Sequence, residues 1–448
     1  MDYGFYSKNE SENKTKHSQG ESIKEAGQTK ISGYWLKIPR LHYYTFNWAE
    51  DSLIKQRLKK QKSTFHNLLA KQTYNDGSVL IVLHELSKTG APILGVELAK
   101  RIKVSTNVII ISSRGGALEE VLKDLAIPFV IIDLASGSLS IKNIIKEAKV
   151  KRAIINSIAS YPIISVLKKE DIPMVSLVHE FYSSHITDPK VFRTLHDSSR
   201  AVYYPAPLVA NDALISDPLL NQNKVRVYPQ GLIRSPTPKN PVIKASVNRL
   251  LREIAFDTDE REFIIVLGIG TVQTRKGVDI FISTAQAMIR KKPLLDFKFI
   301  WIGDVPGKFH YYDYFVYLQD QIKRCGLTEK IYIIESLPSL EAAYKYADIF
   351  FLSSRLDPLP LVSLEAMEYA LPIVCFDGAS GIADYLKESP ITSSTVVPYL
   401  DIELAADKII ELAYNPVERK RIGIAQQNFS RRRFDMDTYT ESILNELG

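Results

Sequence analysis

Two acidic side chains, Asp357 and Glu365, lie on either side of a predicted helix start in the stretch LSSRLDPLPLVSLEAMEYALPIVCF. The apolar run 349–352 predicts a buried strand that ends in a polar loop. Proline is favoured at the first position of a helix, so we predict that the helix begins at Pro360 and stops at 371–372. The free amides and the dipole at such a helix start favour an anion, and phosphate is the usual one.

This helix start assigns a candidate task to each carboxylate. Pro360, Leu361 and Val362 form the candidate anion site. Glu365 is placed to accept hydrogen bonds from two hydroxyls of a ribose, and Asp357 is placed to reach a sugar beyond the phosphates. On spacing alone, a solvated helix carboxylate and a capping or loop carboxylate are the favoured interpretation of the pair.

The segment DPLPLVSLEAMEYALPIVCFDGASGIADYL resembles the signature of the family 4 glycosyltransferases, which are retaining nucleotide-sugar enzymes with the two-domain GT-B fold. Their pattern of two acids separated by seven residues is present, with Asp357 where the first Glu is usual. The resemblance implies that Glu365 binds the donor ribose and that Asp357 approaches the donor sugar. The shorter aspartate is expected to affect the choice of sugar.

A glycine-rich turn, GIGTVQTRKG, opens a second helix in the same half of the chain. A dinucleotide fingerprint needs a third glycine near Gln273, and its absence argues against hydride transfer. In the resembling family, Gly-Arg and then Lys-Gly follow this strand, and the two cations bind the donor diphosphate. Lys276 matches, Gly270 precedes the position where Thr271 replaces the arginine, and Arg275 is a candidate substitute for it.

Three further loops follow predicted strands. Gly90 lies in HELSKTGAP, where it allows close backbone approach to a ligand or simply a tight turn; by the resemblance it belongs to the donor site. His179 follows the run 175–178 and matches the family's histidine on the acceptor side, although a lone loop histidine is usually solvent-facing. Gly303 matches a strand-end glycine of the donor domain, or is a plain turn.

Continuous apolar runs alternate with helical stretches, which predicts parallel strands covered on both faces. We therefore predict an α/β protein of the GT-B type, with two Rossmann-like parallel-sheet domains facing across a cleft. The strands are expected at 79–83, 108–112, 129–133, 153–156 and 175–178, and then at 263–268, 297–303, 331–335, 349–353 and 373–376. The predicted divisions are a polar and basic extension (1–76), an N-terminal acceptor domain (77–240), a C-terminal donor domain (259–425) and a C-terminal helix returning to the N-terminal domain (426–448).

Length, composition and charge limit the number of domains and the kinds of partner that the protein can have. A chain of 448 residues is too long for a single domain of ordinary size. No apolar run is long enough to cross a membrane. The two cysteines support neither a disulfide framework nor a zinc site. The formal charge of +6 is concentrated at the N-terminus: residues 1–76 hold 13 Lys and Arg against 8 Asp and Glu, a net +5. Without a basic face on the folded domains, nucleic acid is excluded as a partner. We expect a cytoplasmic protein.

The extension has three parts. Residues 1–30 are polar enough to predict disorder. The aromatic run at 31–46 should pack on a domain, a partner or a membrane. The stretch 51–72 predicts a helix with an apolar side and six Lys or Arg. Docking on a domain with a solvated basic face is favoured over membrane attachment, but peripheral contact through 31–76 at the inner face of the membrane stays open.

The resemblance implies a retaining glycosyltransferase of hexosyltransferase type that uses a nucleotide-sugar donor and no metal or cofactor, with catalytic roles for His179, Lys276 and Asp357. The acceptor is an unidentified glycan or lipid-linked hydroxyl, in keeping with cell-surface polysaccharide synthesis. A sugar-nucleotide epimerase of the same fold is an alternative, as is a phosphorylase, for which no pyridoxal lysine is found. A non-catalytic partner subunit is a further alternative, motivated by Thr271 and Asp357.

Overall fold

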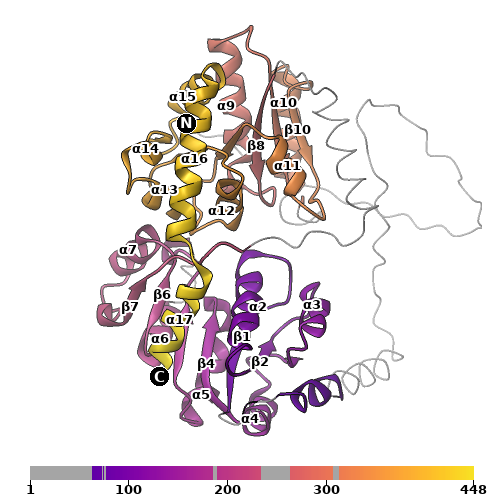
Figure 1. Cartoon of the computed structure of the whole chain (residues 1–448), viewed down its shortest axis with the longest axis vertical. Coiled ribbons are helices and arrows are strands. Elements are labelled where there is room, and N and C mark those ends of the chain that lie inside the picture. Colours follow the sequence, from indigo (N-terminus) through magenta and orange to yellow (C-terminus); the bar gives the residue numbers. More distant parts are fainter. Residues whose placement is uncertain (1–62, 73, 75–76, 185–188, 234–262, 306–311) are drawn as a thin grey trace, which may run out of the picture. The chain divides into compact units, whose positions relative to one another are not determined.

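The computed structural model describes residues 63–72, 74, 77–184, 189–233, 263–305 and 312–448, and these ranges form two parallel β-sheets with helices around them (Figure 1). The predictions for 1–62 and for the proline-rich connection at 234–244 lie outside these residues. The two sheets confirm the predicted α/β, GT-B class.

The first sheet has seven strands in the order β3-β2-β1-β4-β5-β6-β7, all parallel. Helices connect the strands, as parallel pairing requires. The strands are β1 (Ser78–Leu83), β2 (Asn107–Ser112), β3 (Phe129–Ile131), β4 (Val150–Asn156), β5 (Met174–Leu177), β6 (Val202–Tyr204) and β7 (Val225–Val227). The α-helices are α2 (Gly90–Ile102), α3 (Leu118–Asp124), α4 (Ser138–Glu147), α5 (Ile164–Lys169), α6 (Pro189–Ser198) and α7 (Pro207–Ser216).

The second sheet has six strands in the order β10-β9-β8-β11-β12-β13, again all parallel. The strands are β8 (Ile264–Ile269), β9 (Phe297–Ile302), β10 (Ile331–Ile334), β11 (Ile349–Leu352), β12 (Ile373–Phe376) and β13 (Val396–Val397). The α-helices are α9 (Val278–Lys291), α10 (Tyr312–Arg324), α11 (Glu341–Tyr346), α12 (Leu361–Glu368), α13 (Gly381–Leu386), α14 (Pro390–Ser393), α15 (Ile402–Tyr414), α16 (Pro416–Arg433) and α17 (Met436–Leu447).

Strand side chains alternate between two buried faces. In β1, Leu80 and Val82 belong to one apolar cluster, whereas Val79 and Ile81 belong to another. This is why the strands are continuously apolar rather than alternating with polar residues. The ten predicted strands agree with the structure to within a few residues. Strands β6, β7 and β13, of three, three and two residues, were not predicted, since such short runs carry almost no pattern.

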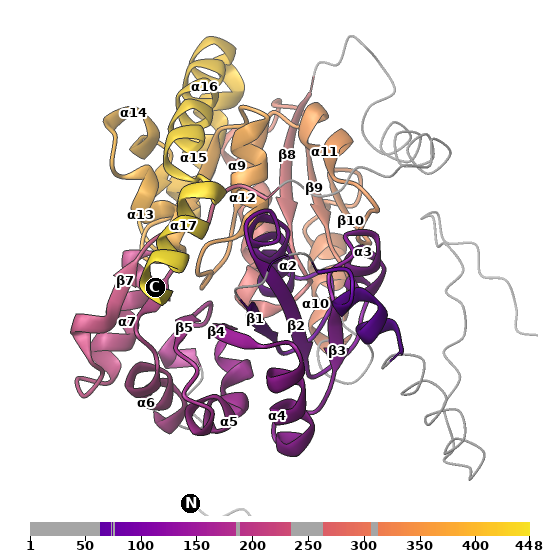
Figure 2. The ribbon, with the colours of Figure 1, turned by 60° about the horizontal axis from the view of Figure 1, so that its bottom comes forward.

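The C-terminal segment consists of two helices, α16 and α17, joined through a short break (Figure 2). Helix α16 ends at Arg433 with Phe434 as its C-cap, and Asp435 caps the start of α17, where its side chain accepts a hydrogen bond from the Thr438 amide at 2.7 Å. The predicted boundary at 426 falls inside α16, so the return to the N-terminal domain begins with α17. There Ser442 contacts the hydroxyl of Tyr203, at 2.7 Å between the two oxygens.

The described part of the N-terminal extension packs on the first domain. Residues 63–69 are helical, and Phe65 and Leu68 are 2% and 9% exposed. Phe65 lies in the same apolar cluster as β1 and β4. This end of the basic stretch is therefore docked, and 63–72 belongs with the N-terminal domain rather than with a separate extension. Among the described residues, no helix is both long and apolar enough to span a membrane.

Candidate active site

The loop between β11 and α12 contains the first predicted carboxylate. Asp357 pairs with the loop that follows β12: its amide donates to the Ala379 carbonyl at 2.8 Å, and its carbonyl accepts from the Gly381 amide at 3.0 Å. A Cβ on Gly381 would lie 2.0 Å from the Pro358 carbonyl oxygen, so only glycine allows the two loops to approach this closely. Asp357 is 4% exposed as a result.

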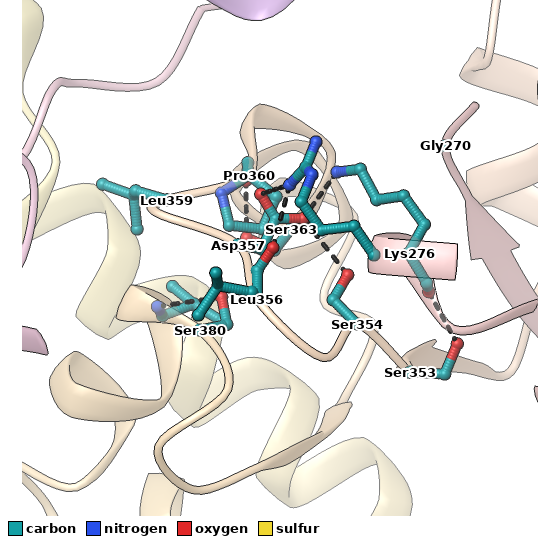
Figure 3. Close-up of polar contacts among 12 residues, drawn as sticks. Gly270, Lys276, Ser353, Ser354, Leu356, Asp357, Leu359, Pro360, Ser363 and Ser380 are labelled. Carbon is teal, nitrogen blue, oxygen red and sulfur yellow. Dashed lines mark hydrogen bonds and ion pairs between the residues drawn. The ribbon is translucent and has the colours of Figure 1, made fainter. Parts of the chain in front are cut away.

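Two cations and a hydroxyl surround the Asp357 carboxylate (Figure 3). The Lys276 ammonium lies 2.5 Å from Oδ2, the Arg275 guanidinium lies 3.5 Å from Oδ1, and the Ser354 hydroxyl donates to Oδ2 at 3.2 Å. Burial is the largest influence on the pKa of Asp357 and would raise it. The charges of Lys276 and Arg275, with the two hydrogen bonds, outweigh burial and lower that pKa, so the carboxylate is ionised.

Lys276 is held at the end of a 3₁₀ turn (Thr274–Lys276) by the next residue, Gly277. Gly277 has a φ of +69°, and a Cβ there would lie 2.0 Å from the carbonyl oxygen of Ser353. The aliphatic part of the Lys276 side chain passes over Gly270. A Cβ at position 270 would lie 3.2 Å from Cδ of Lys276. Both glycines thus place the ammonium beside Asp357, a role that fits their position in the sequence motif.

Arg355 links the same two segments from another side. Its guanidinium contacts both oxygens of Asp279, at 2.8 and 2.6 Å, and donates to the Thr274 carbonyl at 2.8 Å. Its amide also donates to the carbonyl of Arg275 at 2.9 Å. Burial would raise the pKa of Asp279, but Arg355 and the Tyr314 hydroxyl lower it on balance. This bidentate pair fixes the turn that carries the two cations.

The helix α12 begins one residue later than predicted. Pro360 is the N-cap, with φ −70° and ψ 124°, and Leu361 is the first helical residue. The Ser363 amide and hydroxyl both donate to the Pro360 carbonyl, at 3.1 and 2.6 Å. The amides of Leu361 and Val362 precede the first intrahelical hydrogen bond, so they are the candidate donors for an anion at this helix start.

Glu365 lies on the buried side of α12 and is 7% exposed. The hydroxyl of Tyr344, on α11, donates to its Oε2 at 2.9 Å and also contacts the Val362 carbonyl at 3.3 Å. Tyr344 is stacked on Tyr369, with ring centroids 5.3 Å apart. The carboxylate is therefore held in one orientation by a side chain that the sequence pattern does not reveal.

Gly303 has a packing role in the structure. A Cβ there would lie 2.0 Å from the carbonyl oxygen of Gly270, so the loop after β9 contacts the loop after β8 directly. Glycine at 303 is required by this contact between the two loops. The contact supports the turn that carries Lys276.

A second group of predicted residues lies at the carboxyl edge of the first sheet. Asn156, at the end of β4, donates from Nδ2 to the Ala91 carbonyl at 2.6 Å, and its Oδ1 lies 2.7 Å from Nε2 of His179. The amide orientation makes Nε2 the protonated nitrogen and leaves Nδ1 as an acceptor. Gly90, one residue before Ala91, is the first residue of α2, with nothing within 4 Å of where a Cβ would stand.

The environment keeps His179 neutral. Burial lowers the pKa of this imidazole most, the charge of Glu180 opposes that effect, and His84 lowers the pKa further. The His179 amide donates to the Glu180 carboxylate at 2.8 Å, which fixes the loop. Among the described residues, no hydrogen bond or ion pair joins this group to the Asp357 cluster.

The structure thus gathers Gly270, Arg275, Lys276, Gly303 and Asp357 around one turn, with Pro360, Leu361, Val362 and Glu365 on the adjoining helix. It gathers Gly90 and His179 separately through Asn156. Sequence reasoning missed Asn156, Arg355 and Tyr344. Asn156 ends an apolar strand run and could have been found as a polar strand-end residue. Nothing local marks Tyr344, which reaches Glu365 from another helix.

Two parallel-sheet domains that follow one another in the chain are characteristic of the GT-B fold. Solved structures with the fold include Anabaena HepE in complex with UDP-glucose, with a TM-score of 0.69, 17% identity, and coverage of 83% of this chain and 99% of that one. Sucrose-phosphate synthase from Thermosynechococcus elongatus aligns with a TM-score of 0.64 and 13% identity, over 82% of this chain and 98% of that one. At these identities the likeness establishes the fold.

Residues 252–429 match the family described as glycosyl transferases group 1. The match covers the second sheet and most of the helices around it, while the described residues as a whole have the GT-B fold. The match does not single out family 4.

Curated relatives cover shorter stretches. The amylovoran biosynthesis glycosyltransferase AmsD of Erwinia amylovora is 30% identical over 108 residues, which is 24% of this chain and 30% of that protein. The alpha-D-kanosaminyltransferase of Streptomyces kanamyceticus is 28% identical over 177 residues, 38% of this chain and 41% of that protein. The chain thus spans well under half the length of either relative.

Proposed function

We propose that this protein is a retaining glycosyltransferase that moves a hexose from a nucleotide-sugar donor to a hydroxyl acceptor. The observation that carries the proposal is the cluster of Lys276, Arg275 and buried Asp357 beside the amide terminus of α12. Its two cations and one carboxylate leave a net positive charge, to which the helix dipole adds. A diphosphate is the complementary ligand.

The cluster is suited to the departure of a diphosphate. As the bond between the anomeric carbon and the phosphate oxygen breaks, negative charge grows on the diphosphate. Lys276, Arg275 and the amides of Leu361 and Val362 are fixed before this charge develops, which is the condition for strong electrostatic stabilisation. These groups supply the positive charge that a divalent metal supplies elsewhere, so we propose turnover without metal or cofactor.

The positions of Glu365, Asp357 and His179 suggest which part of the donor or acceptor each one contacts. Glu365, oriented by Tyr344, accepts hydrogen bonds from the donor ribose, and Asp357 lies on the side of the donor sugar. The acceptor oxygen bonds to the anomeric carbon on the face from which the diphosphate leaves, and its proton passes to a diphosphate oxygen. Configuration is thereby retained. His179, neutral and held by Asn156, contacts the sugar or the acceptor from the N-terminal domain.

The test is a screen of purified nucleotide sugars for release of the nucleoside diphosphate, with EDTA present. UDP-glucose is the first donor to try, because the HepE structures contain UDP and UDP-glucose. We expect release by the wild-type protein and its loss in Lys276→Met. An epimerised nucleotide sugar as the product would instead establish the epimerase alternative, and a strict requirement for magnesium or manganese would contradict the metal-free mechanism.

A non-catalytic partner subunit is the second candidate, because Thr271 replaces the usual arginine and Asp357 engages both remaining cations. Isothermal titration with UDP, GDP and ADP separates the two functions. Binding of one nucleoside diphosphate, followed by turnover of its sugar, supports the transferase. Absence of binding to all three by folded protein supports the partner subunit.

For the acceptor we propose a glycan or lipid-linked hydroxyl in polysaccharide synthesis at the cytoplasmic face of a membrane, in line with the role named for AmsD. Contact through 31–76 would use the net +5 charge of residues 1–76, each Lys or Arg adding about 1 kcal/mol near an anionic surface. Because Phe65 is part of the core, the informative deletion is 1–62. It should abolish co-sedimentation with anionic liposomes and leave donor hydrolysis intact. Full-length protein that ignores such liposomes at low salt would defeat the membrane contact.

A further inference from the structure

Gln230 connects the N-terminal domain to the start of α12. It follows β7 and is 5% exposed. Its Nε2 donates to the carbonyl oxygen of Leu359 at 3.0 Å. Leu359 immediately precedes the N-cap Pro360 and stands two residues after Asp357. The Gln230 amide therefore lies beside the segment that joins the charged cluster to the anion-binding amides.

The other half of this amide has no partner. Oε1 of Gln230 is buried and accepts no hydrogen bond from any residue that the structure describes. Buried polar atoms are nearly always paired, so an orphaned amide oxygen needs an explanation. Rotating the amide would not resolve it, because Oε1 would then face the Leu359 carbonyl oxygen.

The backbone at this position is equally fixed. A Cβ on Gly231 would lie 2.2 Å from the amide nitrogen of Met436, at the start of α17. The amide of Leu232 donates to the Phe434 carbonyl at 3.0 Å. Close packing on the break between α16 and α17 thus holds the Gln230 backbone beside the start of α12, and Oε1 has no partner among the described residues.

We propose that Oε1 of Gln230 accepts a hydrogen bond from a hydroxyl of the transferred sugar, which makes Gln230 a donor-binding residue supplied by the N-terminal domain. This inference rests on the proposed function. The diphosphate offers no hydrogen-bond donors, and the ribose is assigned to Glu365, further along α12. The sugar is the part of the donor that brings several hydroxyls to the Asp357 side of the helix start.

The experiment compares Gln230→Met with wild type by isothermal titration of a nucleoside diphosphate and the matching nucleotide sugar. The pair is whichever the wild type binds among UDP and UDP-glucose, GDP and GDP-mannose, and ADP and ADP-glucose. Methionine keeps the side-chain length but removes both hydrogen-bonding atoms. Losing the Leu359 contact affects both ligands alike, whereas losing the Oε1 contact affects only the nucleotide sugar. We expect the ratio of the two affinities to change by about tenfold.

Donors lacking single sugar hydroxyls sharpen the result. One deoxy sugar lacks the hydroxyl that Oε1 contacts. For the nucleotide of that sugar, the ratio of its affinity to that of the nucleoside diphosphate should be the same in wild type and in Gln230→Met, because the hydroxyl that Oε1 would contact is absent from this ligand. The control is Tyr385→Phe, which removes another buried hydrogen bond between the domains, from the Tyr385 hydroxyl to the Pro205 carbonyl at 2.7 Å. It should leave the ratio unchanged.

Failure of the glycosyltransferase function and failure of the sugar contact by Gln230 give different results. A wild-type protein that binds none of the nucleotide sugars overturns the proposed function itself. Normal binding with an unchanged affinity ratio in Gln230→Met overturns the role of Gln230 alone. An equal change of the ratio in Tyr385→Phe also overturns it, because the effect would then belong to the domain contact in general.

Discussion

The edges of the two sheets differ in how they hold their candidate residues. At the second sheet, Asp357 is surrounded by Lys276, Arg275 and Ser354, so charge fixes the geometry. At the first sheet, Asn156 and His179 are joined by neutral hydrogen bonds, and the pKa of the imidazole is lowered. A cationic edge suits a diphosphate, whereas an edge with a neutral imidazole and amide beside the Glu180 carboxylate suits the hydroxyls of a sugar or an acceptor. The proposed donor side and the proposed acceptor side therefore differ in their electrostatics.

Removing the ammonium is expected to have the largest effect. Lys276→Met should lower kcat by about 10²–10³-fold, the loss typical of a preorganised group that stabilises developing negative charge. Turnover of the donor is the measurement. The control is Lys291→Met, which breaks an ion pair with Asp407 at the other end of α9. Equal losses in both variants would mean that Lys276 serves only the fold.

Removing the ribose contact should have an intermediate effect. Glu365→Ala should weaken nucleoside diphosphate binding by about 10–100-fold, since a charged hydrogen bond contributes about 1.5–3 kcal/mol. Titration calorimetry on folded protein measures this. Glu368→Ala, on the same helix but paired with Arg431, is the control. Unchanged nucleotide affinity in Glu365→Ala would remove Glu365 from the donor site.

Substitution at the edge of the first sheet, at His179, should change the rate of transfer and not nucleotide binding. His179→Gln should lower transfer to the acceptor by about tenfold, the equivalent of one hydrogen bond, while nucleoside diphosphate affinity stays at the wild-type value. Separate measurements of transfer and nucleotide binding make the distinction. A matching loss of nucleotide affinity would place His179 on the diphosphate and erase the proposed difference between the edges.

The smallest effect concerns pH and stability. Because the pKa of His179 is lowered in the fold, the unfolded chain takes up a proton below its ordinary pKa of about 6.5 that the folded chain does not, so stability falls as the pH decreases. The pKa of Asp357 is also lowered, but its contribution is complete above about pH 4 and is lost only below that. Denaturant unfolding at pH 7.5 and 5.5 should show a smaller loss in His179→Gln than in wild type. Identical losses would contradict the buried, neutral imidazole.

The sequence by itself determined the α/β class, both sheets and most of their strands, because continuous apolar runs leave few other solutions. It also placed Lys276, Asp357 and Glu365 at the carboxyl ends of strands or at the start of a helix. Its errors were local. Pro360 caps α12 instead of opening it, since its ψ of 124° is extended, and α16 ends at Arg433, with a new helix capped by Asp435, where a single helix was expected.

The tertiary structure decided which side chains meet. Asp357 and Lys276 are 81 residues apart, and Tyr344 reaches Glu365 from a different helix. Gln230 reaches Leu359 across 129 residues and from the other domain. No periodicity encodes such pairs, because each depends on the packing of distant elements, and a buried polar atom can be recognised as paired or orphaned only when all its neighbours are in place.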